Sequence, residues 1–403
     1  MEKTIVVVGT LDTKGHEFAY VKEMIEQHGL NTLVVDFGVL ENPVFKPDID
    51  RYQVAKAGGG DLEYLSSGDH KDEAMKTMAE GLCVVVRKLY DDGKLDGILG
   101  MGGGGGTSIA TAAMRILPYG VPKMMLSTMA GGDVSEYTGI KDITLMPSVV
   151  DVAGFNPISR QIYANAAGAI AGMVKQESPS VDDDRPLIAA SMFGNTTKSV
   201  DRARQRIENE GYDVLVFHAT GTGGKTMESL ISEGFIKGSL DITTTELADE
   251  VCGGVLSAGP DRCMAASRVG IPAVIVPGCV DMANFFSVDS VPEKYKKRNL
   301  YKWNPNITLL RTNVEENRKI GKMIAGAANA SAAPVAIFLP LHGVSMLDSP
   351  GGDFWDPEAD NACFEAIKEN LNPGIPVVEM ENNINDVEFS DRVAATLLDM
   401  ITN

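Results

Sequence analysis

Short apolar runs alternate with helical patterns along the chain, and glycine, proline or serine follows most of these runs. A helical pattern from Gly15 to His28 separates the first two runs. Near-continuous apolar strands separated by helices predict a mostly parallel sheet with helices on both faces. The strands expected in the first half are Thr4–Val8, Thr32–Val35, Gly97–Leu99, Lys123–Leu126 and Ile143–Met146.

The pattern then restarts. Gln176–Pro186 is charged and contains proline, so we predict a linker between a subdomain of residues 1–180 and one of residues 181–403. The second half adds expected strands and helices of its own. These are the strands Leu187–Phe193, Val214–Phe217, Val335–Leu339 and Pro376–Glu379, and the helices Ser199–Asn209 and Asp391–Ile401.

Two local similarities favour an internal duplication. YGVPKMML from Tyr119 parallels VGIPAVIV from Val269, and ITLM at Ile143 parallels ITLL at Ile307. Each ITL segment precedes a helical pattern rich in small residues, and Thr312 with Glu315 predicts a capping box for the second one. Chance similarity between two α/β domains is the alternative.

Composition narrows the function classes. The 403 residues carry 36 Lys and Arg against 55 Asp and Glu, a formal net charge of -19. That balance argues against a protein that coats nucleic acid or an anionic membrane. The five cysteines include no C-x-x-C pair, and no run approaches the ~18 apolar residues of a spanning helix. We therefore expect a cytoplasmic protein without nucleic-acid or membrane partners.

A glycine run gives the best functional signal. It reads GMGGGGGTS from Gly100 and opens a helical pattern. Each glycine costs roughly 0.5–1 kcal/mol of backbone entropy, and a turn needs only one or two. The run supplies a surface without Cβ atoms at a positive helix end, where N–H groups converge on an anion. We predict phosphate or nucleotide binding, with a flexible surface loop as the alternative. The residues concerned are Gly102, Gly103, Gly104, Gly105, Gly106, Thr107 and Ser108, the last two also as helix caps.

The first strand–helix turn is expected at the same carboxyl edge of the sheet, where doubly wound sheets bind ligands. Lys14 is a candidate for binding the negative charge of a phosphate. Asp12 is a candidate for holding Mg²⁺ through water. An ordinary capped turn with Thr13 as N-cap is nearly as good an interpretation, and the missing G-x-G-x-x-G speaks against a nicotinamide dinucleotide here. The candidate residues are Gly9, Thr10, Asp12, Thr13 and Lys14, with Ser127 and Thr128 weaker candidates after a later strand.

A second glycine loop, ATGTGGKT from Ala219, matches a relaxed Walker A pattern. It follows the second strand of its half, whereas a P-loop normally follows the first, so a backbone anion or substrate site is the better hypothesis. His342 and the acids after it are candidates for lining a ligand cleft, with a Pro/Gly-rich surface loop as the alternative. The second-ligand residues are Thr220, Gly221, Thr222, Gly223, Gly224, Lys225 and His342.

These motifs together resemble a known family. The chain is similar over nearly its whole length to the ATP-binding region shared by a bacterial protein family and the N-terminal part of a plant tobamovirus-resistance protein. The motifs that carry the resemblance are GTLDTK, GMGGGGGTS, SMFGNTT, VFHATGTGGKTMESLI, LDITTTELADEV, VPGCVDMANF and LPLHGVSMLDSPGGDFWDPEAD.

The resemblance implies two Rossmann-like doubly wound subdomains, ATP with Mg²⁺ in the N-terminal one, and a homodimer. The family's nucleotide-contacting loops fall on Gly9–Lys14 and Gly102–Ser108. The plant protein continues into a barrel-like domain that this chain lacks, which leaves room for a separately encoded partner. No settled catalytic activity comes with the family.

We therefore expect an ATP-binding protein with a cleft between its subdomains. ATP-dependent phosphoryl transfer or ligation on a small anionic metabolite is the enzymatic hypothesis, with positioning and Mg²⁺ in place of a covalent nucleophile. A nucleotide sensor without turnover is the competing class, and an NAD(P) oxidoreductase is a third.

Overall fold

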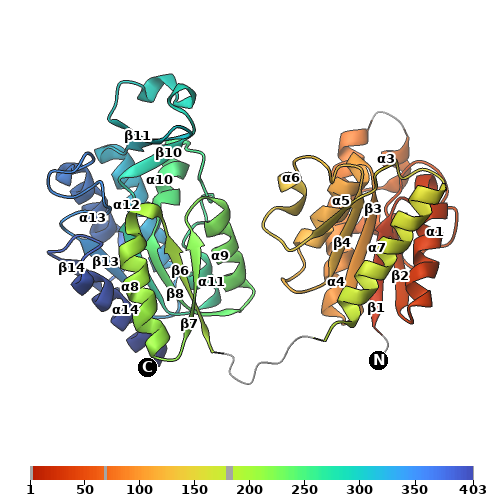
Figure 1. Ribbon diagram of the computed structural model, residues 1–403, viewed down its shortest axis with the longest axis horizontal. Coiled ribbons are helices and arrows are strands. Elements are labelled where there is room, and N and C mark those ends of the chain that lie inside the picture. The colour runs from red at the N-terminus through yellow and green to blue at the C-terminus, as the bar shows by residue number, and fades with distance from the viewer. Residues whose placement is uncertain (1–2, 68–69, 178–184, 403) are drawn as a thin grey trace. The chain divides into compact units, whose positions relative to one another are not determined.

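The computed structural model describes residues 3–67, 70–177 and 185–402. The chain divides into two compact units, residues 1–180 and 181–403 (Figure 1). Most of the predicted linker, residues 178–184, lies outside the described residues.

The N-terminal unit contains a five-stranded parallel sheet. Its order is β2-β1-β3-β4-β5, and the expected strands are confirmed with small shifts at their ends. Because the chain leaves β1 toward β2 on one side and continues from β3 to β5 on the other, the order reverses between β1 and β3. The strands are β1 (Thr4–Gly9), β2 (Asn31–Asp36), β3 (Gly97–Gly102), β4 (Lys123–Ser127) and β5 (Thr144–Pro147).

Helices cover both faces of this sheet, as the apolar strands require. Ile5 and Val7 pack with α1 and α7, whereas Val6 and Val8 pack with the helices of the other face. All four side chains are fully buried. The helices are α1 (Leu11–Gln27), α2 (Arg51–Ala57), α3 (Leu62–Ser66), α4 (Lys71–Asp91), α5 (Gly104–Arg115), α6 (Ser135–Thr138) and α7 (Pro157–Lys175).

The C-terminal unit repeats this arrangement. Its six-stranded parallel sheet runs β7-β6-β8-β9-β13-β14, so its first five strands follow the order of the first sheet. The segments YGVPKMML and VGIPAVIV lead into the fourth strand of each sheet, as a duplication predicts. The strands are β6 (Leu187–Met192), β7 (Asp213–His218), β8 (Ile236–Thr243), β9 (Ala273–Gly278), β13 (Val335–Pro340) and β14 (Val377–Met380).

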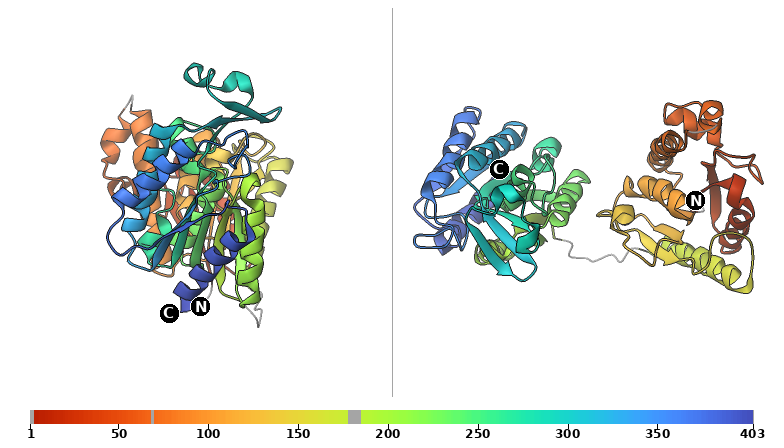
Figure 2. Two further views of the ribbon diagram at one scale, coloured as in Figure 1. Left: turned by 90° about the vertical axis from the view of Figure 1, so that its left-hand side faces the viewer. Right: turned by 90° about the horizontal axis from the view of Figure 1, so that it is seen from above.

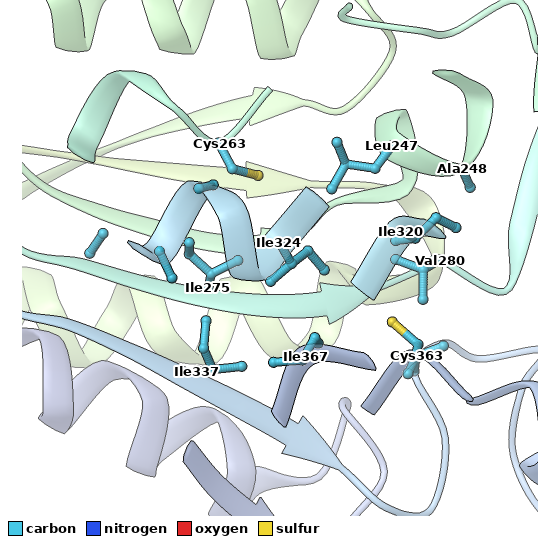
Figure 3. Packing of buried hydrophobic residues seen from close by; sticks show 14 of the residues in the cluster. Leu247, Ala248, Cys263, Ile275, Val280, Ile320, Ile324, Ile337, Cys363 and Ile367 are labelled. Atoms are coloured by element: carbon cyan, nitrogen blue, oxygen red, sulfur yellow. The ribbon is translucent and has the colours of Figure 1, made fainter. Parts of the chain in front are cut away.

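The helices of this unit also cover both faces of the sheet. In the larger core, Leu247, Ile275 and Ile324 meet Ile337 and Ile367 (Figure 3). Residues of α8 and α14 form a second core on the opposite face. The helices are α8 (Thr197–Asn209), α9 (Thr222–Ser232), α10 (Thr245–Cys252), α11 (Ala265–Val269), α12 (Val314–Asn329), α13 (Pro357–Asn370) and α14 (Val387–Thr402).

A small antiparallel sheet, inserted between β9 and β13, shows that the expected correspondence between ITLM at Ile143 and ITLL at Ile307 is wrong. It pairs β10 (Met282–Phe285), β12 (Ile307–Arg311) and β11 (Leu300–Asn304) in that order. The inserted sheet projects from one end of the six-stranded sheet (Figures 1 and 2). ITLL at Ile307 therefore belongs to this small sheet, whereas ITLM at Ile143 leads into β5 of a parallel sheet.

The predicted capping box of α12 is shifted by one residue. Asn313 is the N-cap, and its side chain accepts the N–H of Glu316, whose carboxylate accepts the N–H of Asn313. The hydroxyl of Thr312 instead donates to the carbonyl of Val280 at 2.7 Å. Among the described residues, no helix has the length and apolar character needed to cross a membrane.

Candidate functional site

Two of the predicted loops meet at one cavity. The strands β1 and β3 are parallel neighbours, with Val8 opposite Gly100, so the loops that follow them lie at the point where the strand order reverses. A cavity of about 590 Å³ lies between these loops. The predicted residues that line it are Thr10, Asp12, Thr13, Lys14, Gly103, Gly104, Gly105 and Gly106.

The glycine loop ends in a helix without a cap. The helix α5 begins at Gly104, and its N-cap residue, Gly103, has no side chain to offer. The first helical bond runs from the N–H of Thr107 to the carbonyl of Gly103, at 2.8 Å. Within the described part of the chain, the N–H groups of Gly104, Gly105 and Gly106 have no acceptor. These donors and the helix dipole give the cavity wall a positive end.

Internal packing does not require these glycines. None of Gly103–Gly106 has a positive φ. A Cβ atom built on Gly103, Gly104, Gly105 or Gly106 would meet its nearest neighbour at 3.7, 3.9, 3.4 or 3.6 Å, which is ordinary contact. Alanine would cost less backbone entropy at such positions. What the loop gains from glycine is therefore access to its N–H groups from the cavity.

Four other predicted residues lie away from this cavity. The hydroxyl of Thr107 is fully buried and bonds the hydroxyl of Ser127 at 2.6 Å, so neither group caps the helix. Ser108 is exposed within the first turns of α5, and Thr128 is exposed beyond β4. The expected caps fail because the helix begins at Gly104, three residues earlier than Thr107.

Two glycines that flank these loops have structural explanations. A Cβ on Gly9 would lie 1.9 Å from the ring of Phe18. A Cβ on Gly102 would lie 3.3 Å from the Cα of Gly106. Both residues keep the ends of β1 and β3 close to the segments that follow them.

The first turn brings opposite charges to the cavity. Asp12 accepts the N–H of Thr13 at 2.7 Å and the N–H of Leu40 at 2.8 Å. The ammonium group of Lys14 donates to the carbonyl of Val152 at 2.6 Å while its side chain lines the cavity. Neither Thr10 nor Thr13 caps α1 through its side chain, and their hydroxyl oxygens lie 2.9 Å apart.

A buried carboxylate holds this turn in shape. Asp36, at the end of β2, accepts the N–H groups of Leu11 and Gly38 at 3.0 and 2.9 Å. Desolvation raises the pKa of Asp36 above its ordinary value. The carboxylate fixes the spacing between the β1 and β2 loops on one side of the cavity.

An apolar chamber completes the cavity, and the sequence analysis missed it. It is formed by side chains that follow β2 and by side chains of α3, α4 and α5. Lys71, at the start of α4, adds a second cation to the rim. These segments are distant in sequence, so no local pattern signals the chamber. Its residues are Phe37, Val39, Leu65, Met75, Met78 and Ile109.

The N–H groups of the second glycine loop are already bonded to a side-chain carboxylate of the same unit. Glu246 accepts the N–H groups of Gly221 and Gly224 at 2.7 and 3.0 Å. A Cβ on Gly224 would lie 2.1 Å from that carboxylate, and one on Gly223 would lie 1.7 Å from the carbonyl of His218. Gly221 has a φ of 80°. Each glycine of this loop is therefore required by the fold, in contrast to Gly103–Gly106.

The carboxylate of Glu246 belongs to a buried ion-pair network. Arg262, whose side chain is fully buried, contacts Glu246 at 2.6 Å, Asp241 at 2.5 Å and Glu228 at 3.0 Å. Asp241 also accepts the hydroxyl of Ser191 at 2.6 Å. The network fills the carboxyl ends of β6 and β8, the position that corresponds to the cavity between β1 and β3.

The remaining second-ligand residues do not meet one another. The loop after β7 lies at one edge of the sheet and His342 follows β13, four inter-strand spacings of ~4.8 Å away. His342 is exposed and pairs with Glu381 at 3.0 Å. Thr220 is half-buried, whereas Thr222 and Lys225 are exposed. The prediction of a second ligand on these residues stays a prediction.

Two of the acids after His342, Asp348 and Asp360, form a buried group together with Asp281. Asp348 and Asp360 contact Arg311 at 3.5 and 2.6 Å, and Asp281 accepts the hydroxyl of Ser345 at 2.8 Å. Burial raises the pKa of Asp281 to about 7 and that of Asp360 to about 9. Among the described residues there is no group of three or more His, Cys, Asp or Glu side chains suited to hold a metal ion.

Comparison with protein families matches both units of the chain. Residues 3–179 match the "Uncharacterised protein family (UPF0261) N-terminal domain", and residues 185–401 match its C-terminal domain. A UPF0261 protein of Clostridium tetani is 50% identical over 402 residues, which is 100% of each chain. The ToMV susceptible protein tm-1(GCR26) of Solanum lycopersicum is 36% identical over 98% of this chain and 55% of the tomato protein.

Solved structures resemble the chain at low identity. A UDP-N-acetylglucosamine 2-epimerase is 12% identical, with 68% of this chain and 79% of that chain covered and a TM-score of 0.25. MurG of Acinetobacter baumannii is 11% identical, with 99% and 100% covered and a TM-score of 0.23.

Proposed function

This chain belongs to the UPF0261 family, and we propose that its N-terminal unit binds ATP with Mg²⁺ in the cavity between β1 and β3. The observation that carries the proposal is the run Gly103–Gly106. Its residues need neither positive φ nor close packing, yet they open onto the cavity with three unpaired N–H groups. A phosphate chain is the ligand class that such a helix end favours.

The remaining wall fits the other parts of a nucleotide. Lys14 and Lys71 supply positive charge against the phosphates of an otherwise acidic chain. The apolar chamber around Phe37, Met75 and Met78 suits the planar, weakly polar face of a nucleobase. The volume of about 590 Å³ lies within the usual range for small-molecule sites.

Magnesium fits this site only together with the phosphates. Among the described residues that line the cavity, Asp12 is the one carboxylate, and Mg²⁺ commonly binds through one or two carboxylates plus substrate phosphates. When bound, Mg²⁺ neutralises phosphate charge and stabilises charge that develops during phosphoryl transfer. Asp12 already accepts the main-chain N–H groups of Thr13, Leu40 and Glu41, which fix its orientation toward the cavity rim.

Further proposals concern ATP turnover, the oligomeric state and the location of the protein. ATP-dependent phosphoryl transfer or ligation, a nucleotide sensor without turnover, a homodimer and a cytoplasmic location all remain proposals. A separately encoded partner with a barrel-like domain is a further proposal. Light scattering of the purified chain distinguishes a monomer from a dimer directly.

Matched lysine variants test the ATP site. We expect calorimetric titration with MgATP to give a saturable heat for the wild type and about tenfold weaker binding for Lys14→Met, because a charge-assisted contact is lost. Lys225→Met removes the lysine of the second glycine loop and should leave the affinity unchanged. Absent binding in the wild type, or a larger loss for Lys225→Met than for Lys14→Met, would refute the proposal.

A further inference from the structure

We propose that a second cavity in the N-terminal unit binds a small hydroxyl- or amine-bearing molecule without negative charge, next to the phosphate end of the nucleotide. The cavity measures about 520 Å³ and lies at the carboxyl ends of β4 and β5. That this cavity lies next to a bound nucleotide rests on the proposed function. The preference of its lining for an uncharged or cationic ligand does not depend on that function.

The cavity is built by two neighbouring strand ends. Ser127 and Pro147 are partners at the ends of β4 and β5. The N–H of Ser148 donates to the carbonyl of Ser127 at 3.1 Å, which holds the two following loops side by side. Thr128 and Gly131 line the cavity from the first loop, and Val149 and Asp151 line it from the second.

Two contacts join this cavity to the glycine loop. The N–H of Thr128 donates to the carbonyl of Gly102 at 3.2 Å, and a Cβ on Gly103 would lie 3.7 Å from the Thr128 hydroxyl. Gly103 lines the first cavity and Thr128 the second, so the two cavities share this wall. Lys14 lines the first cavity and bonds the carbonyl of Val152, the residue after Asp151.

The polar groups of the lining define the ligand. Of the described residues that line it, Asp151 is the one with an ionisable side chain, and none is lysine, arginine or histidine. The hydroxyl of Ser127 is engaged with Thr107 and with the N–H of Met129, and that of Ser148 donates to Val150. Asp151 and the exposed Thr128 are left to bind, so the wall favours a donor group and disfavours an anion.

One residue of the wall has an uncommon backbone. Val149 has a φ of 64° and is 75% exposed. β-Branched residues rarely adopt this region, and backbone outliers of this kind cluster at ligand sites. The turn is held by the N–H of Val150, which donates to the carbonyl of Ser148 at 2.7 Å. The strain agrees with a wall shaped for a ligand.

Ethanolamine and glycolate test the charge preference, because both are small hydroxyl compounds with opposite charge. We expect saturation-transfer NMR to detect ethanolamine on the wild-type protein and not glycolate. Asp151→Asn should weaken ethanolamine binding at least fivefold, whereas Glu23→Gln, an exposed change on α1, should have no effect. Equal binding of glycolate, or no binding of ethanolamine, would overturn the proposal.

A filling variant tests the location. Gly131 has a non-positive φ and open space around a built Cβ, so Gly131→Phe can fill the cavity without disturbing the fold. We expect this variant to keep its melting temperature and lose ethanolamine binding; retained binding would contradict the location. MgATP titration of the same samples separates the two proposals. Ethanolamine binding without ATP binding would support the second cavity and refute the proposed function. ATP binding without ethanolamine binding would refute this inference alone.

Discussion

The carboxylate of Glu246 accepts the N–H of Gly224 at 3.0 Å, in the place where a glycine loop of this kind would bind a phosphate. The same oxygen also accepts the N–H of Gly221. The C-terminal unit therefore satisfies its glycine loop with an internal anion. The glycine loop of the N-terminal unit has unpaired N–H groups and a cavity beside them. This difference between the two loops is the reason that we propose a ligand site in the N-terminal unit.

Gly224→Ala should destabilise the C-terminal unit. The new methyl group would lie 2.1 Å from the Glu246 carboxylate and force it away from two N–H donors and from Arg262. We expect a loss on the order of 2–4 kcal/mol. Both tryptophans, Trp303 and Trp355, belong to this unit, so urea unfolding followed by tryptophan fluorescence reports on it alone. An unchanged midpoint would contradict the role of Glu246.

Arg262→Met should have a still larger effect on the same unit. It leaves Asp241, Glu246 and Glu228 without their shared cation in a buried setting. Removing one partner of a buried ion pair commonly costs ~3–5 kcal/mol. The MgATP affinity of the N-terminal unit should survive, and calorimetry on the full chain measures it. Loss of ATP binding together with the tryptophan transition would show that the ATP site depends on the C-terminal unit.

Asp249 should make stability depend on pH. Desolvation raises the pKa of Asp249 to about 7, above the ordinary value of 3.8. Between these values the folded protein holds a proton that the unfolded chain releases, so this contribution to stability is complete below pH 4 and declines as the pH rises to 7.

The variant Asp249→Asn mimics the protonated form of this carboxyl group. The amide oxygen of Asn284 has no hydrogen-bond partner among the described residues and can accept from the new NH₂ group after rotation. We expect the variant to be more stable than the wild type at pH 8, on the order of 1–3 kcal/mol, with a flatter pH profile of the urea midpoint. Asp261→Asn, at an exposed acid, is the control. If the wild type instead gains stability relative to Asp249→Asn as the pH rises from 4 to 7, the predicted direction of the pH dependence is wrong.

The sequence predicts β1 because this strand is buried on both of its faces. Val6 and Val8 face one core and Ile5 and Val7 face the other, so β1 has a continuous run of apolar residues in the sequence. By contrast, β8 contains the buried polar residues Ser239 and Asp241, and Asp241 bonds Ser191 and Arg262. Asp241 is tolerated there because Arg262 reaches it from 21 residues away, and no local pattern reveals that.

The candidate site was predicted where its signal is local. The loops after β1 and β3 each carry a sequence signature, and the parallel sheet brings them together. The apolar chamber was missed because Phe37, Leu65 and Met75 come from separate elements and read as ordinary core residues. The role of Thr107 was misassigned because a glycine run does not reveal where its helix begins.

The account's central claim is that Gly103–Gly106 are glycines for the sake of a ligand, and the double variant Gly104→Ala/Gly105→Ala tests it most directly. A Cβ fits at both positions in the folded protein. Each change should therefore stabilise the fold by ~0.4–1 kcal/mol, as should the control Gly172→Ala, whose Cβ has open space on α7. We predict an unchanged or higher melting temperature, with MgATP affinity reduced at least tenfold in the double variant and unchanged in the control. A double variant that binds MgATP as tightly as the wild type would contradict the account.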